Sequence, residues 1–150
     1  MKTFLTLALT TLTMAVTAAS EPGPATVTGW ATWYSLESCK LDDKIRKVKP
    51  RTKFFTASRT PFSDSVVSCA LPRDIAKKLN VKYGDNIRVT HLNTGNIITV
   101  KYLDRGPGQT SRSTGVIVDL SVAAMRTLAG ETGIQAGRIQ IQLVPARRGD

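Results

Sequence analysis

Two stretches of the chain show the same order of apolar and polar positions, the first from Val66 and the second from Val116. Each has a short β-branched run, a segment with a helical apolar stripe, an apolar-x-x-Gly turn and a strand that alternates with a period of two. In the final strand of the second copy, Ile139, Ile141 and Leu143 share one face. The repeat predicts two structural halves, each of strand, helix and strand.

A β-hairpin is predicted between the two copies. Residues 86–104 read "NIRVTHLNTGNIITVKYLD", and the Asn- and Gly-rich segment 93–96 is typical of a tight turn between strands. A further strand is expected at "TVTGWATWYS", from Thr26, whereas the basic segment 38–53 is expected to be a solvated loop with about one turn of helix. Many short strands and two short helices predict a mainly β fold, a closed barrel without free edges; an open α+β sheet is the alternative.

The first 20 residues have the layout of a secretory signal peptide. Lys2 provides a positive charge, an apolar run extends from Phe4 to Val16, and small residues occupy positions 18–20. No other segment is a candidate membrane span, so we expect the mature protein to be secreted or periplasmic. The predicted organisation is a signal peptide (1–20), an extended lead-in (21–27), one barrel domain (28–145) and a basic tail (146–150).

The chain is strongly basic, with 21 Lys and Arg against 11 Asp and Glu and a formal net charge of +10. Loss of Lys2 with the signal peptide lowers this to about +9. An exported protein of this charge is expected to meet anionic wall polymers, acidic polysaccharides or lipid head groups. Polyanion binding through charge alone is therefore one candidate function, but the composition gives no sign of specific nucleic-acid recognition.

Cys39 and Cys69 are the only cysteines in the chain. In an exported protein such a pair predicts one disulfide, and a reactive thiol or a metal site is the alternative. The chain has one histidine, His91, and no CxxC motif. We therefore expect neither a metal site nor a cofactor.

Asp104 is the first candidate for chemistry. It ends a strand in "KYLDRGPGQ", and strand parity places it on the face of Ile98, Val100 and Tyr102. A carboxyl at the rim of an apolar face is partly desolvated, as a general acid for glycosidic cleavage needs to be. The alternative is an Asp that begins a turn and accepts hydrogen bonds from backbone N–H groups of the "DRGPG" segment.

Three further residues are candidates for a site. Asp119, at the end of the run "VIVDLS", is expected to be a buried carboxylate that holds loop backbone or an arginine. Hydrolysis of a glycan would need a second carboxylate besides Asp104, whereas a lytic transglycosylase can use one acid. Trp30 and Tyr34 share one face of the N-terminal strand and are expected to line a groove for sugars, with Trp33 in the core.

Four segments together carry a family resemblance: "GWATWYS", "TAS" at positions 56–58, "GDNIRVTHLNTGNIITVKYLDRGPG" and "VIVDLSVAAMRTLAG". In order and spacing they resemble the rare lipoprotein A-like double-psi β-barrel family, which is related to barwin and expansin barrels. The resemblance covers about residues 28–144. It implies a six-stranded barrel built from two interlocked halves.

The same resemblance implies a role at the cell wall, because members of this family bind or cleave wall polysaccharide. Rare lipoprotein A proteins act as lytic transglycosylases on peptidoglycan, and Asp104 matches their catalytic aspartate in the "DRGP" motif. Asp119 matches the acid of their "IDLS" motif. The resemblance implies that Arg105 holds anionic or polar groups of the wall.

This chain departs from the active members of the family at the positions of their other functional residues. Their acidic pair corresponds to Thr60 and Ser63, with Asp64 as a substitute after a one-residue slip, and their histidine position falls near Leu71. Two functions therefore stay open. The first is lytic cleavage of peptidoglycan glycan strands with Asp104 as general acid, and the second is non-catalytic binding or loosening of wall polysaccharide. In either case we expect a monomer.

Overall fold

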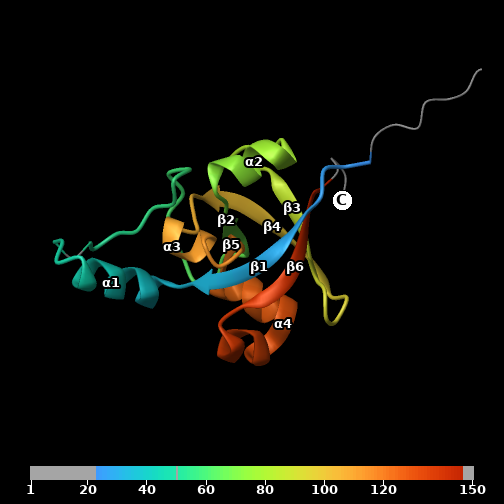
Figure 1. Cartoon of the computed structure of the whole chain (residues 1–150). Coiled ribbons are helices and arrows are strands. Elements are labelled where there is room, and N and C mark those ends of the chain that lie inside the picture. Colours follow the sequence, from blue (N-terminus) through green and yellow to red (C-terminus); the bar gives the residue numbers. More distant parts are fainter. Residues whose placement is uncertain (1–22, 50, 147–150) are drawn as a thin grey trace, which may run out of the picture.

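The computed structural model describes residues 23–49 and 51–146. The predicted signal peptide and most of the predicted basic tail lie outside the described residues. Within them, six strands form one closed barrel in the order β1-β5-β2-β4-β3-β6 (Figure 1). Their bounds are β1 Val27–Tyr34, β2 Ser68–Ala70, β3 Asn86–His91, β4 Ile97–Asp104, β5 Val116–Ser121 and β6 Ile139–Pro145.

The predicted repeat is visible in the pairing of the strands. In the first half β4 pairs with β2 in parallel and with β3 antiparallel, and in the second half β1 pairs with β5 in parallel and with β6 antiparallel. Antiparallel pairs β2–β5 and β3–β6 then join the halves and close the ring. The closed mainly β barrel predicted from the sequence is therefore confirmed, and the open sheet is wrong.

Four helices occur among the described residues, where the sequence predicted two short ones. Their bounds are α1 Leu36–Ile45, α2 Arg73–Leu79, α3 Gln109–Arg112 and α4 Val122–Ala136. The predicted helices are α2 and α4, and the main correction is α1, which replaces the first half of the loop expected at residues 38–53. Two serines form a capping box at the N-terminus of α1: Ser35 Oγ accepts from the Ser38 N–H, and Ser38 Oγ accepts from the Ser35 N–H.

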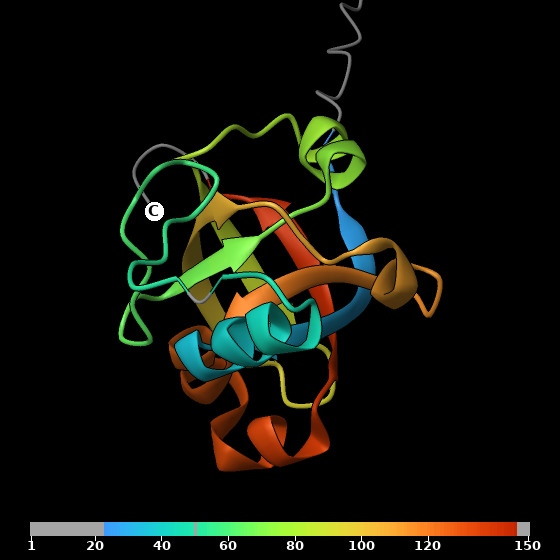
Figure 2. The ribbon, with the colours of Figure 1, turned by 90° about the vertical axis from the view of Figure 1, so that its left-hand side faces the viewer.

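The sequence did not indicate a helix at α1, because the face that this helix buries is not apolar. Asp43 is the buried residue of this helix, whereas Leu41 and Ile45 are 56% and 70% exposed. A helix with this distribution lacks the apolar stripe by which amphipathic helices are recognised. In Figure 2, α1 lies across the face of the barrel that is turned to the viewer.

The core fills the inside of the barrel and the space under α4. Leu120 of β5 and Ile141 of β6 are fully buried there, together with Met125 and Leu128 of α4. Trp33 packs against this core, as predicted, and its Nε1–H donates to the carbonyl of Ile134 at 3.2 Å. The alternating faces of β1 and β6 thus follow the pattern read from the sequence.

The predicted disulfide between Cys39 and Cys69 is not formed, and both thiols are free. Cys69 lies on β2 and is fully buried in the barrel core, whereas Cys39 lies half-buried on α1 outside the barrel. The number of cysteines and the expected compartment could not reveal that one thiol points inward and the other belongs to a separate helix.

Thiol labelling checks this arrangement. In native protein, an excess of a maleimide reagent should label Cys39 and spare Cys69, which is inaccessible. Denaturant should expose both, so intact mass should show one adduct before unfolding and two after it. A native protein that takes no label, and that takes two only after reduction, would contradict the structure.

Core packing gives a second prediction. Leu120→Ala should lower the free energy of unfolding by about 2–5 kcal/mol, because it leaves a cavity in the barrel. The matched control is Leu41→Ala on the exposed side of α1, which should change stability by no more than about 0.5 kcal/mol. Urea denaturation of both variants measures this, and equal effects would contradict the assigned core.

Candidate functional site

Four side chains form one row across neighbouring strands, on the outer face of the barrel. Thr32 of β1 pairs with Asp119 of β5, Asp119 pairs with Ala70 of β2, and Ala70 pairs with Asp104 of β4. Paired positions point to the same side of a sheet, and adjacent strands are about 4.8 Å apart. The Cα atoms of Asp104 and Asp119 are therefore about 10 Å apart, on either side of Ala70.

A bulge at the end of β4 brings Asp104 into this row. Tyr102 pairs with Cys69, whereas Asp104 pairs with Ala70, so two residues on β4 advance against one on β2. Cys69 faces the core, and Ala70 therefore faces outward. The expectation that Asp104 continues the apolar face of Tyr102 is corrected, because the extra residue turns the carboxyl away from the barrel interior.

Hydrogen bonds fix one side of the Asp104 carboxyl group. Its Oδ1 accepts from the backbone N–H of Ala57 and from that of Arg105, both at 2.8 Å. The first bond ties the "TAS" segment to the end of β4, and Ser58 N–H adds a bond to the carbonyl of Leu103 at 3.0 Å. The backbone contacts expected for a turn-initiating Asp are present, and the residue also lines a groove.

The Asp119 carboxylate is strongly desolvated. Burial raises the pKa of Asp119, and the charge of Asp104 acts in the same direction, while the hydrogen bond donated by the Thr32 hydroxyl to Oδ1 opposes them. The expected arginine partner is absent from the described contacts, and Thr32 takes its place. Burial is therefore the main cause of the raised pKa of Asp119.

The "DRGPG" segment folds back over Ala70 toward Asp119. A Cβ atom on Gly106 would lie 2.9 Å from Asp119 Oδ2 and 3.4 Å from the Ala70 Cβ, so only glycine fits without displacing the carboxylate. The Leu71 N–H donates to the carbonyl of Asp104 at 3.0 Å and anchors the start of the segment. The motif thus forms one wall of the space above the two acids.

This space is a groove of about 350 Å³ between the barrel and α1. Ser38, Cys39 and Asp42 of α1 line one side, and Asp104, Arg105 and Asp119 line the other. The face of α1 that points into it was missed by the sequence analysis. The spacing of Asp42 and Arg46, which form an i,i+4 ion pair, was the available signal for a helix there.

Tyr34 also lines the groove, as predicted, and its ring stacks on Phe62 with the centroids 5.0 Å apart. The Tyr34 hydroxyl is buried and has no hydrogen-bond partner among the described residues. Burial raises the pKa of Tyr34, and the charges of Asp104 and Asp119 add to this, so the hydroxyl stays protonated. The Tyr34 hydroxyl lies beside the side chain of Ser68, which is fully buried and which lowers the Tyr34 pKa, so the hydroxyl faces the interior.

The structure brings together Asp104, Asp119, Arg105 and Tyr34 from the predicted site residues, but not Trp30. Trp30 is on the predicted outer face of β1, four residues before Tyr34, which is about 13 Å along a strand. The Arg138 guanidinium lies 4.6 Å from the centroid of its ring. Trp30 therefore belongs to a different part of the surface.

The positions that hold the acidic pair and the histidine in active members of the resembled family contribute nothing to the groove. Thr60 Oγ1 and Ser58 Oγ are hydrogen-bonded at 3.0 Å, and Ser63 Oγ contacts Ser65 Oγ at 2.8 Å. Leu71 is fully buried in the core. Asp64 is no substitute, because its Oδ1 accepts from the Leu36 N–H at 2.7 Å at the start of α1.

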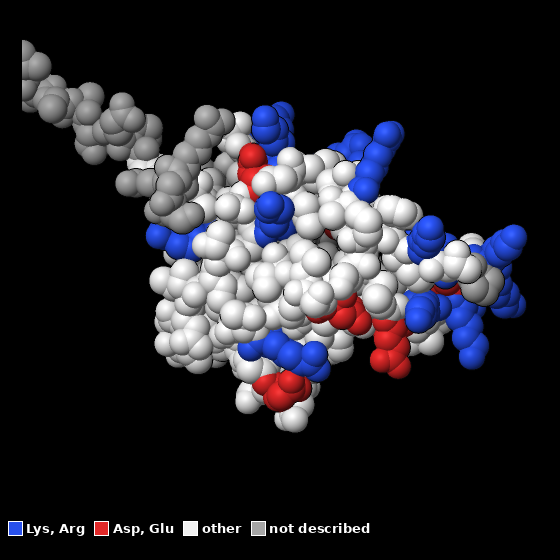
Figure 3. Space-filling model, turned by 180° about the vertical axis from the view of Figure 1, so that it is seen from behind, with Lys and Arg blue, Asp and Glu red and all other residues white. Residues whose placement is uncertain are grey.

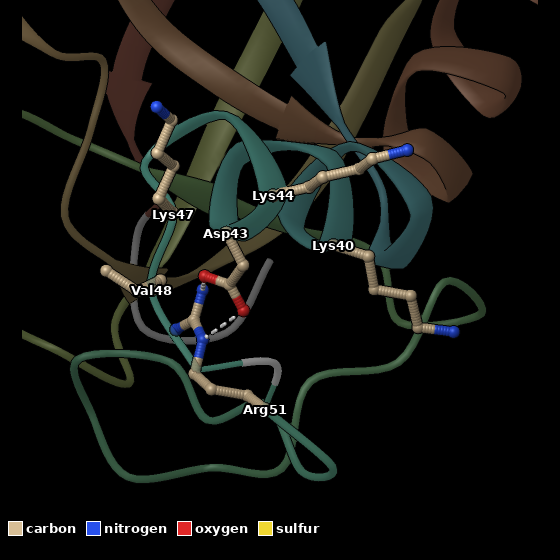
Figure 4. A pocket seen from close by; sticks show the side chains of 6 residues that line it. All are labelled: Lys40, Asp43, Lys44, Lys47, Val48 and Arg51. Atoms are coloured by element: carbon tan, nitrogen blue, oxygen red, sulfur yellow. Dashed lines mark hydrogen bonds and ion pairs between the residues drawn. The ribbon is translucent and has the colours of Figure 1, made fainter.

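A larger cavity of about 590 Å³ lies on the other side of α1 (Figure 4). Arg51 forms two hydrogen bonds to the Asp43 carboxylate, at 2.7 and 2.9 Å, and these hold the pKa of Asp43 below its usual value. Arg51 also lies over the Phe54 ring, 4.5 Å from its centroid. The pair joins α1 to the segment that follows, so its role is structural, and the neighbouring lysines Lys40, Lys44 and Lys47 surround it.

Within residues 23–49 and 51–146, no group of three potential metal-ligating side chains is found. None of the described helices is long and apolar enough to cross a membrane.

Comparison with known proteins gives likenesses at the level of structure. No protein-family model and no curated protein matches the chain. Streptomyces papain inhibitor superposes with a TM-score of 0.52 at 21% identity, over 81% of this chain and 94% of its own. The expansin of Clavibacter michiganensis superposes with a TM-score of 0.55 at 24% identity, over 83% of this chain. A mutant of that expansin in complex with cellohexaose gives 0.55 at 23% identity over 83%.

The fold is a double-psi β-barrel. This confirms the resemblance drawn from the sequence at the level of fold, since these neighbours are double-psi barrel relatives and the six-stranded closed barrel is shared. The match covers nearly all of the inhibitor. In each of the two expansin structures it covers about half, 52%, of the expansin chain.

The raised pKa of Asp119 predicts a stabilising variant. A folded-state pKa above the unfolded value means that ionisation of Asp119 at neutral pH opposes folding. Asp119→Asn carries no charge and can still accept from Thr32, so it should increase the free energy of unfolding at pH 7. The gain should fall as the pH drops through the folded pKa and vanish below about pH 3.9, where both states are protonated.

Urea denaturation of the two proteins between pH 3 and pH 7 measures this difference. Thr32→Val is the companion variant: it removes the hydroxyl that favours the charged form and should lower stability at pH 7. A less stable Asp119→Asn protein at pH 7 would show that the carboxylate has a stabilising partner.

Proposed function

We propose that this double-psi barrel is a non-catalytic cell-wall polysaccharide-binding protein, and that the glycan lies in the groove between α1 and the "DRGPG" segment. The observation that carries the proposal is the row of Asp119, Ala70 and Asp104 in that groove. The two carboxylates present acceptors for sugar hydroxyls along one wall of the groove. The side chain of Tyr34 lines the same groove.

Two features favour binding over cleavage. The helper positions expected for cleavage hold Thr60, Ser63 and Leu71, none of which lines the groove. Asp104 Oδ1 is occupied by two backbone N–H groups, which position the carboxylate as a fixed acceptor. A similar barrel in an expansin has been seen with cellohexaose, which supports a linear glycan as the ligand class.

The second candidate function is lytic cleavage of peptidoglycan glycan strands with Asp104 as general acid. Its support is the position of Asp104 at the groove with Oδ2 making no hydrogen bond to any described residue. Lysis needs one acid only, so Asp119 would then act through the charge that it places beside Asp104. We propose the same setting for both functions: a monomer, exported by its signal peptide, that is secreted or periplasmic.

Binding and cleavage are separated by one experiment with insoluble peptidoglycan. Wild-type protein and Asp104→Asn should both co-sediment with it, and neither should release anhydro-sugar fragments. Asp104→Asn loses one charge-assisted hydrogen-bond acceptor, so its affinity for peptidoglycan should be roughly tenfold lower than that of wild type. The matched control is Glu131→Gln, the same carboxylate-to-amide change at an exposed position of α4, which should bind like wild type.

Release of anhydro-sugars by wild type but not by Asp104→Asn would replace the binding proposal by the lytic one. Absence of both co-sedimentation and release would end both proposals for this polymer.

A further inference from the structure

The helix α1 and the segment that follows it project from the barrel, to the left in Figure 1. Eight large apolar side chains are exposed among the described residues, and four of them lie at this projecting end: Leu41, Ile45, Val48 and Phe55. Phe55 belongs to this end because it lines one pocket together with Leu36 and Lys40. Apolar side chains that gather on a surface in this way mark a place where another molecule or a membrane is met.

Lysines lie beside these apolar residues. On α1, Lys40 and Lys44 are four residues apart, and so are Leu41 and Ile45. Residues four apart share one face of a helix, and consecutive residues lie about 100° apart around its axis. A lysine stripe therefore runs next to an apolar stripe along the exposed side of α1.

The positive charge of this side is not neutralised by the protein. Lys40, Lys44 and Lys47 line the cavity of Figure 4, and none of them forms an ion pair with a described residue. Figure 4 shows their amino groups pointing away from the ion pair at the centre of the picture. Glu37 lies on the same side, two turns before Lys44, and the three lysines outweigh its single negative charge. The surface is therefore both apolar and cationic.

This side of α1 is separate from the groove. Cys39 and Asp42 are the groove-lining residues of the middle of the helix. Around the helix axis, Leu41 lies about 160° from Cys39, and Lys44 about 140°. A partner on the exposed side therefore leaves the groove side of the helix free.

An anionic lipid surface matches both features of the exposed side. Phosphates of the lipid head groups complement the lysines, and the acyl chains directly beneath them accept apolar side chains. A soluble polyanion would use the lysines but leave the apolar side chains in water. An apolar protein surface would bury the lysines without partners, which is costly.

We propose that α1 docks the protein onto membranes that contain anionic lipids. Lys40, Lys44 and Lys47 contact the head-group phosphates, while Leu41 and Ile45 insert between the acyl chains. The inference does not rest on the proposed glycan binding, which uses the other side of the helix.

The test measures co-sedimentation of the protein with two kinds of vesicle, one of phosphatidylcholine alone and one of equal parts phosphatidylcholine and phosphatidylglycerol. Wild type should bind the second kind only. Lys40→Gln/Lys44→Gln/Lys47→Gln should lower its affinity about a hundredfold, at about fivefold for each lysine. Leu41→Gln/Ile45→Gln keeps every charge and should lower the affinity at least about tenfold, because no side chain of α1 then inserts.

Two variants with the same changes elsewhere are the matched controls. Lys77→Gln/Lys78→Gln/Lys82→Gln removes three exposed lysines from α2 and the turn that follows it. Leu92→Gln/Ile97→Gln replaces two exposed apolar residues of the hairpin between β3 and β4. Both should keep most of the affinity of wild type. All the substituted side chains are exposed, so the fold should be retained in every variant.

An equal loss of affinity in the two lysine variants shows attraction by overall charge and overturns docking through α1. Unchanged binding of the Leu41→Gln/Ile45→Gln variant overturns it as well, since the helix then does not insert. The same holds if wild type fails to bind the anionic vesicles. Each of these results leaves the glycan proposal untouched, because that proposal is tested on peptidoglycan without lipid.

Discussion

The groove depends on the position of β2, which has only three residues and lies between β4 and β5. Ser121 holds it in register: the Ser121 hydroxyl accepts from the Ser68 N–H at 3.1 Å and donates to the Val66 carbonyl at 2.6 Å. A slip of one residue would put Cys69 or Leu71 in the place of Ala70. Either side chain would collide with Gly106, which packs over Ala70 beside Asp119, so the register of one short strand decides whether the "DRGPG" segment can form this wall of the groove.

The sequence predicted those parts of the fold that follow a simple period. The repeat gave the two halves, and the parity of β1 placed Trp33 in the core and Tyr34 on the groove side. Asp104 was found for a reason that was only partly correct. Parity assigns it to the face of Tyr102, and the bulge that turns it outward arises from pairing with β2, which no local pattern records.

Other parts of the site were beyond the sequence because they depend on which surfaces meet. In α1, Asp43 is buried against Arg51, which lies eight residues later in the sequence. Leu41 and Ile45 of the same helix are exposed. The spacing of apolar residues in the segment that forms α1 therefore predicted a loop and not a helix. The prediction of a disulfide was wrong for a related reason. Cys69 is buried inside the barrel, whereas Cys39 lies on α1 outside the barrel. In both cases the residue types were visible in the sequence, but tertiary packing decided which side chains point into the protein and which point outward.

The charge of this protein acts at two distances. Lys and Arg are scattered over the face shown in Figure 3 and gather at the end that carries α1, so a polyanion is attracted over long distances whatever its structure. Close to the groove the pattern is finer. Asp42 and Asp43 neutralise the arginines nearest to them, Asp104 and Asp119 make the centre acidic, and Arg73 and Arg105 remain unpaired beside it. Long-range attraction therefore acts on any polyanion, whereas the order of acids and arginines at the groove gives this part of the surface a local pattern of charge.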